Sequence, residues 1–139
     1  MKALTVCYSR TGFTKKVGQT IAKELKCDFE EIIDTKNRAG GWNYLAAGFE
    51  AARRKQTKIK PTKKDPSKYD LVIIGTPVWA GKMSSATRTY ISKFKYSFKK
   101  VAFFCTMGGG GDKSAFKDME DACNKKPKAR LTLLTKEIA

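Results

Sequence analysis

The chain has 139 residues, enough for one domain with one hydrophobic core, and its apolar runs are too short to span a membrane. It contains no histidine, which excludes Ser-His and Cys-His nucleophiles, and its four cysteines lack the spacing of a metal site. The formal net charge is +16, and no signal-like segment precedes the first strand, so we expect a basic cytoplasmic protein.

The first part of the chain alternates strand and helix patterns. A buried strand is predicted over residues 2–8, and an amphipathic helix over 13–25. A second strand lies around 29–33. After a Gly-Gly breaker, a helix is predicted over 42–54, and a polar loop with two prolines follows over 55–68.

The second part continues the same alternation. Its clearest strand is apolar throughout its centre, as expected when both faces of a parallel sheet are covered. The pattern predicts one α/β domain, 1–139, with a doubly wound five-stranded parallel sheet. The elements expected here are a strand over 69–75, a loop over 76–81, a helix over 84–95, a strand over 101–105, a glycine run over 108–111, a helix over 112–124 and a strand over 130–136.

The loop that joins the first strand to the first helix is dense in hydroxyl groups. Ser9, Thr11 and Thr14 can donate hydrogen bonds to phosphate oxygens, and Gly12 lets the backbone approach a ligand closely. The unpaired N–H groups at the start of the helix also favour an anion. From its residues alone, the loop is either an anion site or an ordinary hydroxyl-capped helix start.

Two later loops also follow buried strands. In an open parallel sheet, ligands bind beyond the carboxyl ends of the strands, where the strand order reverses. The loops after the first, third and fourth strands are all rich in small or hydroxyl residues. We therefore expect these three loops to converge on one crevice.

The three loops resemble those of flavodoxins. The flavodoxin phosphate loop, Ser/Thr-x-Thr-Gly-x-Thr, is matched in full by residues 9–14. The second flavin loop often reads Thr/Ser-Pro-x-aromatic-x-Gly, as residues 76–81 do, and the glycine-rich residues 106–111 stand where the third loop lies. The resemblance implies a flavodoxin-like sheet with strand order 2-1-3-4-5 and FMN as the cofactor.

The resemblance also implies a role for each loop. The first would hold the FMN phosphate, the second would line one side of the isoalloxazine ring, with Trp79 as a stacking surface, and the third would contact the pyrimidine edge. No residue is predicted to be catalytic. The implied cofactor-binding residues are Ser9, Arg10, Thr11, Gly12, Phe13, Thr14, Thr76, Pro77, Val78, Trp79, Ala80, Gly81, Thr106, Met107, Gly108, Gly109, Gly110 and Gly111.

Two features of the sequence differ from the pattern of many flavodoxins. The third loop has no aromatic residue, so the second flavin face would be open or covered by Met107, Trp42 or Tyr44. The family normally ends with a helix packed on the sheet, and residues 137–139 cannot supply one. We therefore expect this C-terminal helix to be missing, and we predict exposed apolar surface and a homodimer.

Two functions fit this resemblance. The first is an FMN-binding protein that carries electrons between redox partner proteins. The alternative is an FMN-dependent NAD(P)H:quinone or related oxidoreductase on the same fold, which the open third loop allows. Many flavodoxins are acidic, so the charge of +16 points to acidic partners instead. A nucleic-acid-binding module is disfavoured, because no aromatic-studded basic sheet face or known motif is present.

Overall fold

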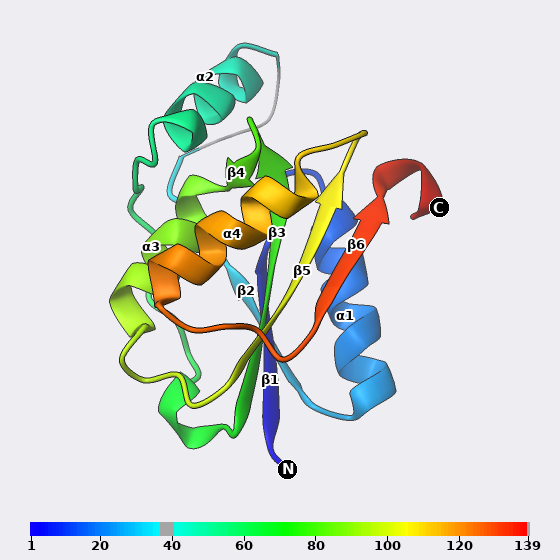
Figure 1. The fold of residues 1–139 in the computed structure, drawn as a ribbon, viewed down its shortest axis with the longest axis vertical. Helices are drawn as coiled ribbons and strands as arrows, with labels where there is room; N and C mark the ends of the chain where they lie inside the picture. Colours follow the sequence, from blue (N-terminus) through cyan, green and yellow to red (C-terminus); the bar gives the residue numbers. More distant parts are fainter. Residues whose placement is uncertain (37–40, 139) are drawn as a thin grey trace.

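The computed structural model describes residues 1–36 and 41–138, and of residues 41–44 it describes the backbone only. Its centre is a parallel sheet whose strand order is β2-β1-β3-β5-β6 (Figure 1). This order confirms the predicted 2-1-3-4-5 arrangement of the five long strands. Their bounds are β1 Ala3–Tyr8, β2 Asp28–Ile32, β3 Leu71–Trp79, β5 Val101–Met107 and β6 Arg130–Leu134.

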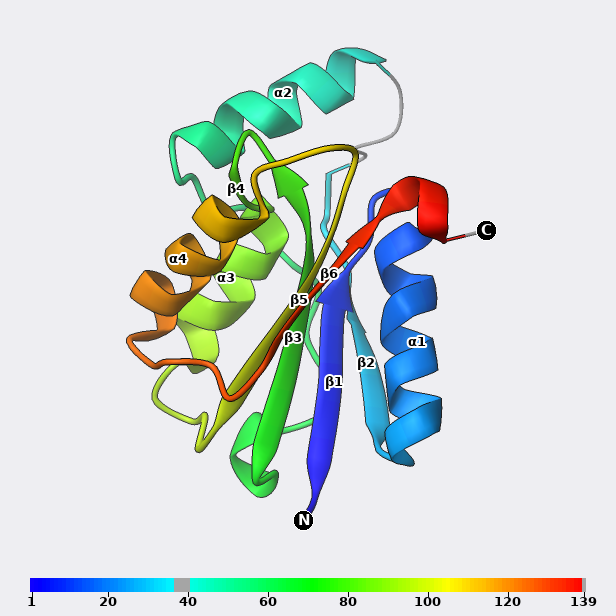
Figure 2. The same cartoon turned by 45° about the vertical axis from the view of Figure 1, so that its right-hand side comes forward.

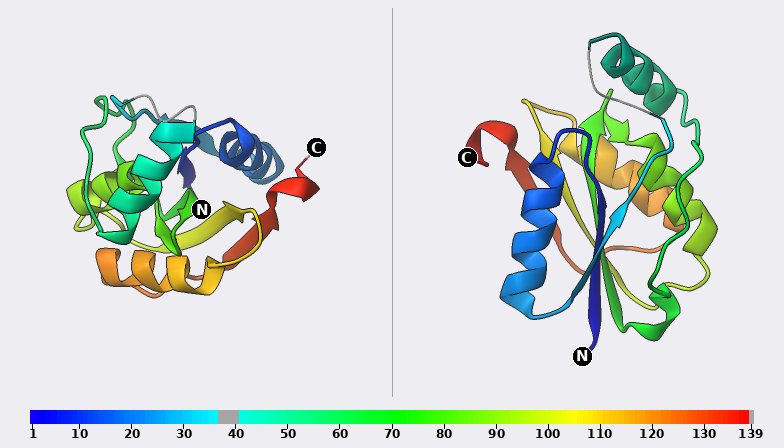
Figure 3. Two further views of the ribbon diagram at one scale, coloured as in Figure 1. Left: turned by 90° about the horizontal axis from the view of Figure 1, so that it is seen from above. Right: turned by 180° about the vertical axis from the view of Figure 1, so that it is seen from behind.

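Helices cover both faces of this sheet. Helix α1 (Phe13–Leu25) packs on one face, and α3 (Ser85–Phe94) and α4 (Asp112–Cys123) pack on the other (Figures 2 and 3). Helix α2 (Gly41–Ala52) lies beyond the carboxyl ends of the strands (Figure 2). Two short 3-10 turns are also present, Pro66–Lys68 and Thr135–Glu137.

The third strand is longer than the sequence indicated. The prediction of a loop from residue 76 onward was wrong at its start, because β3 continues to Trp79. Pairing with β5 persists as far as Pro77, and Val78 and Trp79 then pair with an antiparallel strand, β4 (Lys82–Met83). The predicted second flavin loop is therefore the end of a strand followed by a tight hairpin.

Side chains alternate between the two faces of the sheet and build two apolar clusters. The larger cluster lies under α3 and α4, and the smaller cluster lies under α1. In the smaller one, the Phe104 ring lies directly over Gly75 of the neighbouring strand. A Cβ atom at Gly75 would lie only 2.0 Å from the ring Cζ. The absence of a side chain at Gly75 therefore makes the room that this ring occupies.

The α1 face of the sheet is less covered toward its β6 edge. The Leu131 side chain is 46% exposed, and Leu133 and Ile138 are partly buried beside α1. A groove between α1 and β6 is lined by these residues together with Val17 and Ile21. Some of the predicted exposed apolar surface is thus present at this edge, and self-association through it stays a prediction.

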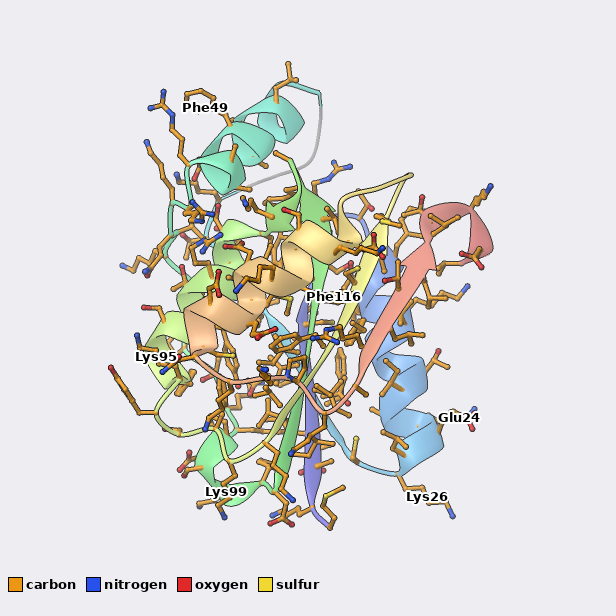
Figure 4. All side chains as sticks on the ribbon, viewed as in Figure 1. Glu24, Lys26, Phe49, Lys95, Lys99 and Phe116 are labelled. Atoms are coloured by element: carbon orange, nitrogen blue, oxygen red, sulfur yellow. The ribbon has the colours of Figure 1, made fainter. Side chains whose placement is uncertain are left out.

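Basic side chains are not gathered in one place. In Figure 4, Lys95 and Lys99 extend at the lower left of the molecule and Lys26 at the lower right. Among the described helices, none has the length and hydrophobicity that a membrane crossing requires.

Candidate functional site

A cavity of about 240 Å³ opens at the carboxyl ends of β1, β3 and β5. The loops that follow β1 and β5 and the end of β3 form its walls, so the predicted convergence of the three segments is present. The lining residues are Ser9, Arg10, Thr11, Phe13, Thr14, Pro77, Val78, Trp79, Thr106, Met107, Gly108 and Thr135.

Eleven of these twelve lining residues belong to the set implied by the flavodoxin resemblance. Thr135 was missed, although it follows the last strand and so lies at the same edge of the sheet. Seven residues of the implied set are not among the lining residues: Gly12, Thr76, Ala80, Gly81, Gly109, Gly110 and Gly111. Several of these seven shape the loops, as the contacts below show.

The amino end of α1 is open toward an anion. Its N-cap residue is Gly12, in a left-handed conformation with φ of 101°, and no side chain caps the helix. Ser9 Oγ accepts the Gly12 N–H at 2.9 Å, which folds the loop back on itself. By contrast, the Ser84 side chain caps α3 by accepting from the Thr87 N–H. First-turn N–H groups of α1 therefore remain open to a phosphate.

The hydroxyl of Thr14 connects two of the three loops. Thr14 is 2% exposed, and its Oγ1 lies 2.8 Å from Oγ1 of Thr106. The Thr14 carbonyl also accepts a long hydrogen bond from the Cys7 thiol. This residue therefore joins the start of α1 to the end of β5, whereas the sequence motif assigned its hydroxyl to the phosphate.

Trp79 stands at the tip of the β3–β4 hairpin. The turn that follows it needs positive φ at two residues, 50° at Ala80 and 73° at Gly81. The Trp79 side chain lines the cavity but is only 4% exposed, and its ring packs edge-on against Tyr8 with centroids 5.5 Å apart. Stacking of Trp79 on a flavin stays a prediction, and it would use the small exposed part of the ring.

The third loop packs against this hairpin. Gly111 is the N-cap of α4 and has a φ of 96°. A Cβ atom there would lie 3.0 Å from Val78 Cγ1 and 3.2 Å from Gly81 Cα. The need for glycine at position 111 thus comes from contact between two loops. Met107 lines the cavity, whereas the side chains of Trp42 and Tyr44 lie outside the described residues.

The buried thiols near the site are not nucleophiles. Burial raises the pKa of the Cys105 thiol to about 11 and also raises the pKa of Cys7. Both groups therefore remain protonated at neutral pH. Among the described residues that line the cavity, Arg10 carries the one ionisable side chain.

Comparison with known proteins gives one family and a set of related folds. The model of the flavodoxin family matches residues 2–138. The chain is similar to a flavoprotein from Lactobacillus acidophilus NCFM in complex with FMN, with 25% identity, a TM-score of 0.84, and coverage of 94% of this chain and 92% of that chain.

More distant similarity extends to a reductase. The apo-form of the Lactobacillus acidophilus NCFM flavoprotein, solved by NMR, is 24% identical with a TM-score of 0.70, over 94% of this chain and 91% of that chain. An NADPH-quinone reductase from P. pentosaceus has 10% identity and a TM-score of 0.55, over 97% of this chain and 86% of that chain. No curated protein matches the sequence.

We expect Gly111→Ala to destabilise the protein by about 1–3 kcal/mol, because it forces a side chain into a left-handed residue and against the hairpin. Gly110→Ala is the matched control, since a Cβ atom there meets no atom within 4 Å. Its effect should stay within about 0.5 kcal/mol. Urea unfolding of both variants measures the difference, and equal stability would contradict the loop contact.

Proposed function

The chain belongs to the flavodoxin family, and we propose that it binds FMN in this cavity and carries electrons between redox partner proteins. The observation that carries the proposal is the uncapped start of α1, which opens at a cavity walled by all three predicted segments. The FMN complex of the Lactobacillus acidophilus NCFM flavoprotein supports the choice of cofactor. FMN supplies the redox chemistry when bound, and the protein supplies binding and orientation.

The residues at one end of the cavity suit the phosphate. Backbone N–H groups at the start of α1 would donate to its oxygens, together with the hydroxyls of Ser9 and Thr11. Arg10 adds a positive charge, and no acidic residue stands in the first turn of α1. A phosphate dianion would therefore meet donors, and no carboxylate stands among the described residues that line the cavity.

The remaining lining residues suit a flat and largely apolar ring. Pro77, Val78 and Met107 offer apolar surface, and Gly108 brings a backbone close to the same space. No lining side chain other than Arg10 is ionisable, so the described residues offer no evident general acid or base to a substrate. This composition supports a carrier, which needs no such group.

An FMN-dependent NAD(P)H:quinone or related reductase is the second candidate. It is favoured by a largely apolar hollow of about 430 Å³ behind Trp79, between the hairpin and α2. Leu45 and Phe49 of α2 line this hollow with Trp79 and Ala80, and it could admit an apolar acceptor. The fold similarity to an NADPH-quinone reductase is compatible with this candidate but shows the fold alone.

Flavin binding tests the first part of the proposal. We expect purified protein to bind both FMN and riboflavin, and Thr11→Ala to weaken FMN binding about tenfold, because a hydrogen bond to a charged group is lost. Riboflavin affinity should not change, since riboflavin lacks the phosphate. Quenching of flavin fluorescence measures both dissociation constants.

Thr20→Ala is the matched control for this measurement. The Thr20 hydroxyl donates to the Lys16 carbonyl at 2.9 Å on α1, and Thr20 does not line the cavity. Equal loss of FMN and riboflavin in Thr11→Ala would place the phosphate elsewhere. Failure of the unmodified protein to bind FMN would refute the proposed function.

Turnover separates the carrier from the reductase. A carrier loaded with FMN should accept electrons from dithionite in two resolved one-electron steps. It should also oxidise NADH and NADPH, with menadione as acceptor, no faster than free FMN does. Steady oxidation of either nucleotide above that background, measured at 340 nm, would favour the reductase instead.

We propose acidic proteins as the redox partners, because the net charge of +16 attracts them over distances of about 10 Å. Oxidation of the reduced protein by anionic ferricyanide should slow as salt is added, and oxidation by a cationic cobalt complex should quicken. Stopped-flow rates at several ionic strengths test this, and rates independent of salt would contradict it.

Sedimentation of the same sample tests the predicted homodimer. A strictly monomeric protein would exclude it.

A further inference from the structure

One buried carboxylate joins the hairpin to the helices around it. Asp118 of α4 is 4% exposed, and its Oδ2 accepts a hydrogen bond from Arg88 of α3, which is itself 7% exposed. The same oxygen accepts the backbone N–H of Met83 at 3.2 Å. The second oxygen, Oδ1, accepts from Nε of Arg54 at 3.4 Å.

The Met83 contact reaches the wall of the flavin cavity. Met83 is the last residue of β4, which pairs with Val78 and Trp79 of β3. Both Val78 and Trp79 line the cavity. The Asp118 carboxylate therefore fixes the returning strand of the hairpin whose outgoing strand would contact the ring.

A second hydrogen bond holds the residue that follows β4. The Ser84 N–H donates to Thr76 Oγ1 at 3.0 Å, which joins the start of α3 to β3. This bond is between neutral groups, whereas the acceptor of the Met83 N–H is the carboxylate that pairs with Arg88. Charge-assisted hydrogen bonds are roughly twice as strong as neutral ones. Asp118 therefore supplies the charge-assisted side-chain contact to β4.

The network also includes the end of α2. Arg54 is the second residue after that helix, in a left-handed conformation with φ of 55°, and its N–H donates to the Ala51 carbonyl. Helix α2 lies against the tip of the hairpin, where Phe49 and Ala52 share the apolar hollow with Trp79 and Ala80. One carboxylate thus bonds both to β4 of the hairpin and to a residue that follows α2.

The ion pair is poorly explained by stability alone. The Nε atom of Arg88 is buried and has no hydrogen-bond partner in the described structure, so the guanidinium is only partly satisfied. Buried ion pairs are often no better for stability than apolar residues of similar volume, and some instead specify one geometry. The geometry specified here is that of the hairpin.

We propose that Asp118, held by Arg88, is a positioning residue that fixes the β3–β4 hairpin for contact with the flavin ring. The inference rests on the proposed FMN site and adds residues that do not line it. Because the hairpin faces the ring and not the phosphate, loss of Asp118 should weaken FMN and riboflavin binding equally. This pattern differs from that of Thr11→Ala, which affects FMN alone.

The test compares Asp118→Asn with the control Glu120→Gln. Glu120 is also on α4 and pairs with Arg130 at 3.6 Å, and among the described residues its carboxylate has no hydrogen bond or ion pair with the hairpin. We expect the dissociation constants of Asp118→Asn for both flavins to rise about tenfold, as a charged acceptor becomes neutral. In the flavin-free protein, the Met83 amide should exchange with solvent about tenfold faster. The control should stay within about twofold in both measurements.

A double variant covers the outcome in which Asp118→Asn does not fold. Asp118→Leu with Arg88→Met removes both buried charges and leaves Met83 without its acceptor, so it should fold and still bind both flavins weakly. A folded Asp118 variant that binds both flavins within about twofold of the unmodified protein would overturn the inference. A loss of affinity for FMN alone, with riboflavin binding unchanged, would also overturn the inference. If the unmodified protein binds neither flavin, the proposed function fails and the inference falls with it.

Discussion

A parallel sheet delivers the carboxyl end of every strand to the same edge, and the candidate site depends on this constraint. Residues Cys7, Gly75 and Phe104 lie side by side in neighbouring strands, and β1 ends one residue, β5 three residues and β3 four residues beyond this row. The chain that follows each strand must then cross the same small region. Thr14 and Thr106, 92 positions apart in the sequence, meet at 2.8 Å for this reason.

The position of α1 over the sheet follows from close packing at its centre. Phe104 fills the space above Gly75, and Gly18 of α1 lies over Cys7 and Phe29 so closely that a Cβ atom would come within 3.0 Å of the Cys7 sulfur. Small residues in both the strand and the helix therefore let α1 approach the sheet. Since Gly12 and Phe13 begin this helix, the same packing sets where its open N–H groups point.

Strand and helix periodicity are local signals, so the sequence predicted an α/β domain with a parallel sheet and the convergence of the three segments, while the order of the five long strands came from the resemblance to flavodoxins. It did not predict β4 or the continuation of β3, since a two-residue strand has no periodicity and Thr-Pro usually indicates a loop. The depth at which Trp79 is buried depends on Tyr8 and on α2, which no local pattern encodes. Asp118 was read only as part of a helix, because its partners lie 30, 35 and 64 positions away.

The surface charge of the protein acts over longer distances than the hydrogen-bonding groups of the candidate site do. Lysines spread over the surface are screened by salt within about 8–10 Å, so they would affect the rate at which charged partners approach more than the affinity for FMN. In the proposed site, Arg10 and the N–H groups of α1 would act within hydrogen-bond distance of the phosphate, where screening is weak. Because reduction adds negative charge to a flavin, nearby positive charge also favours the reduced cofactor. A basic member of this family can therefore differ from acidic ones in partners and potential while keeping the same three segments around its cavity.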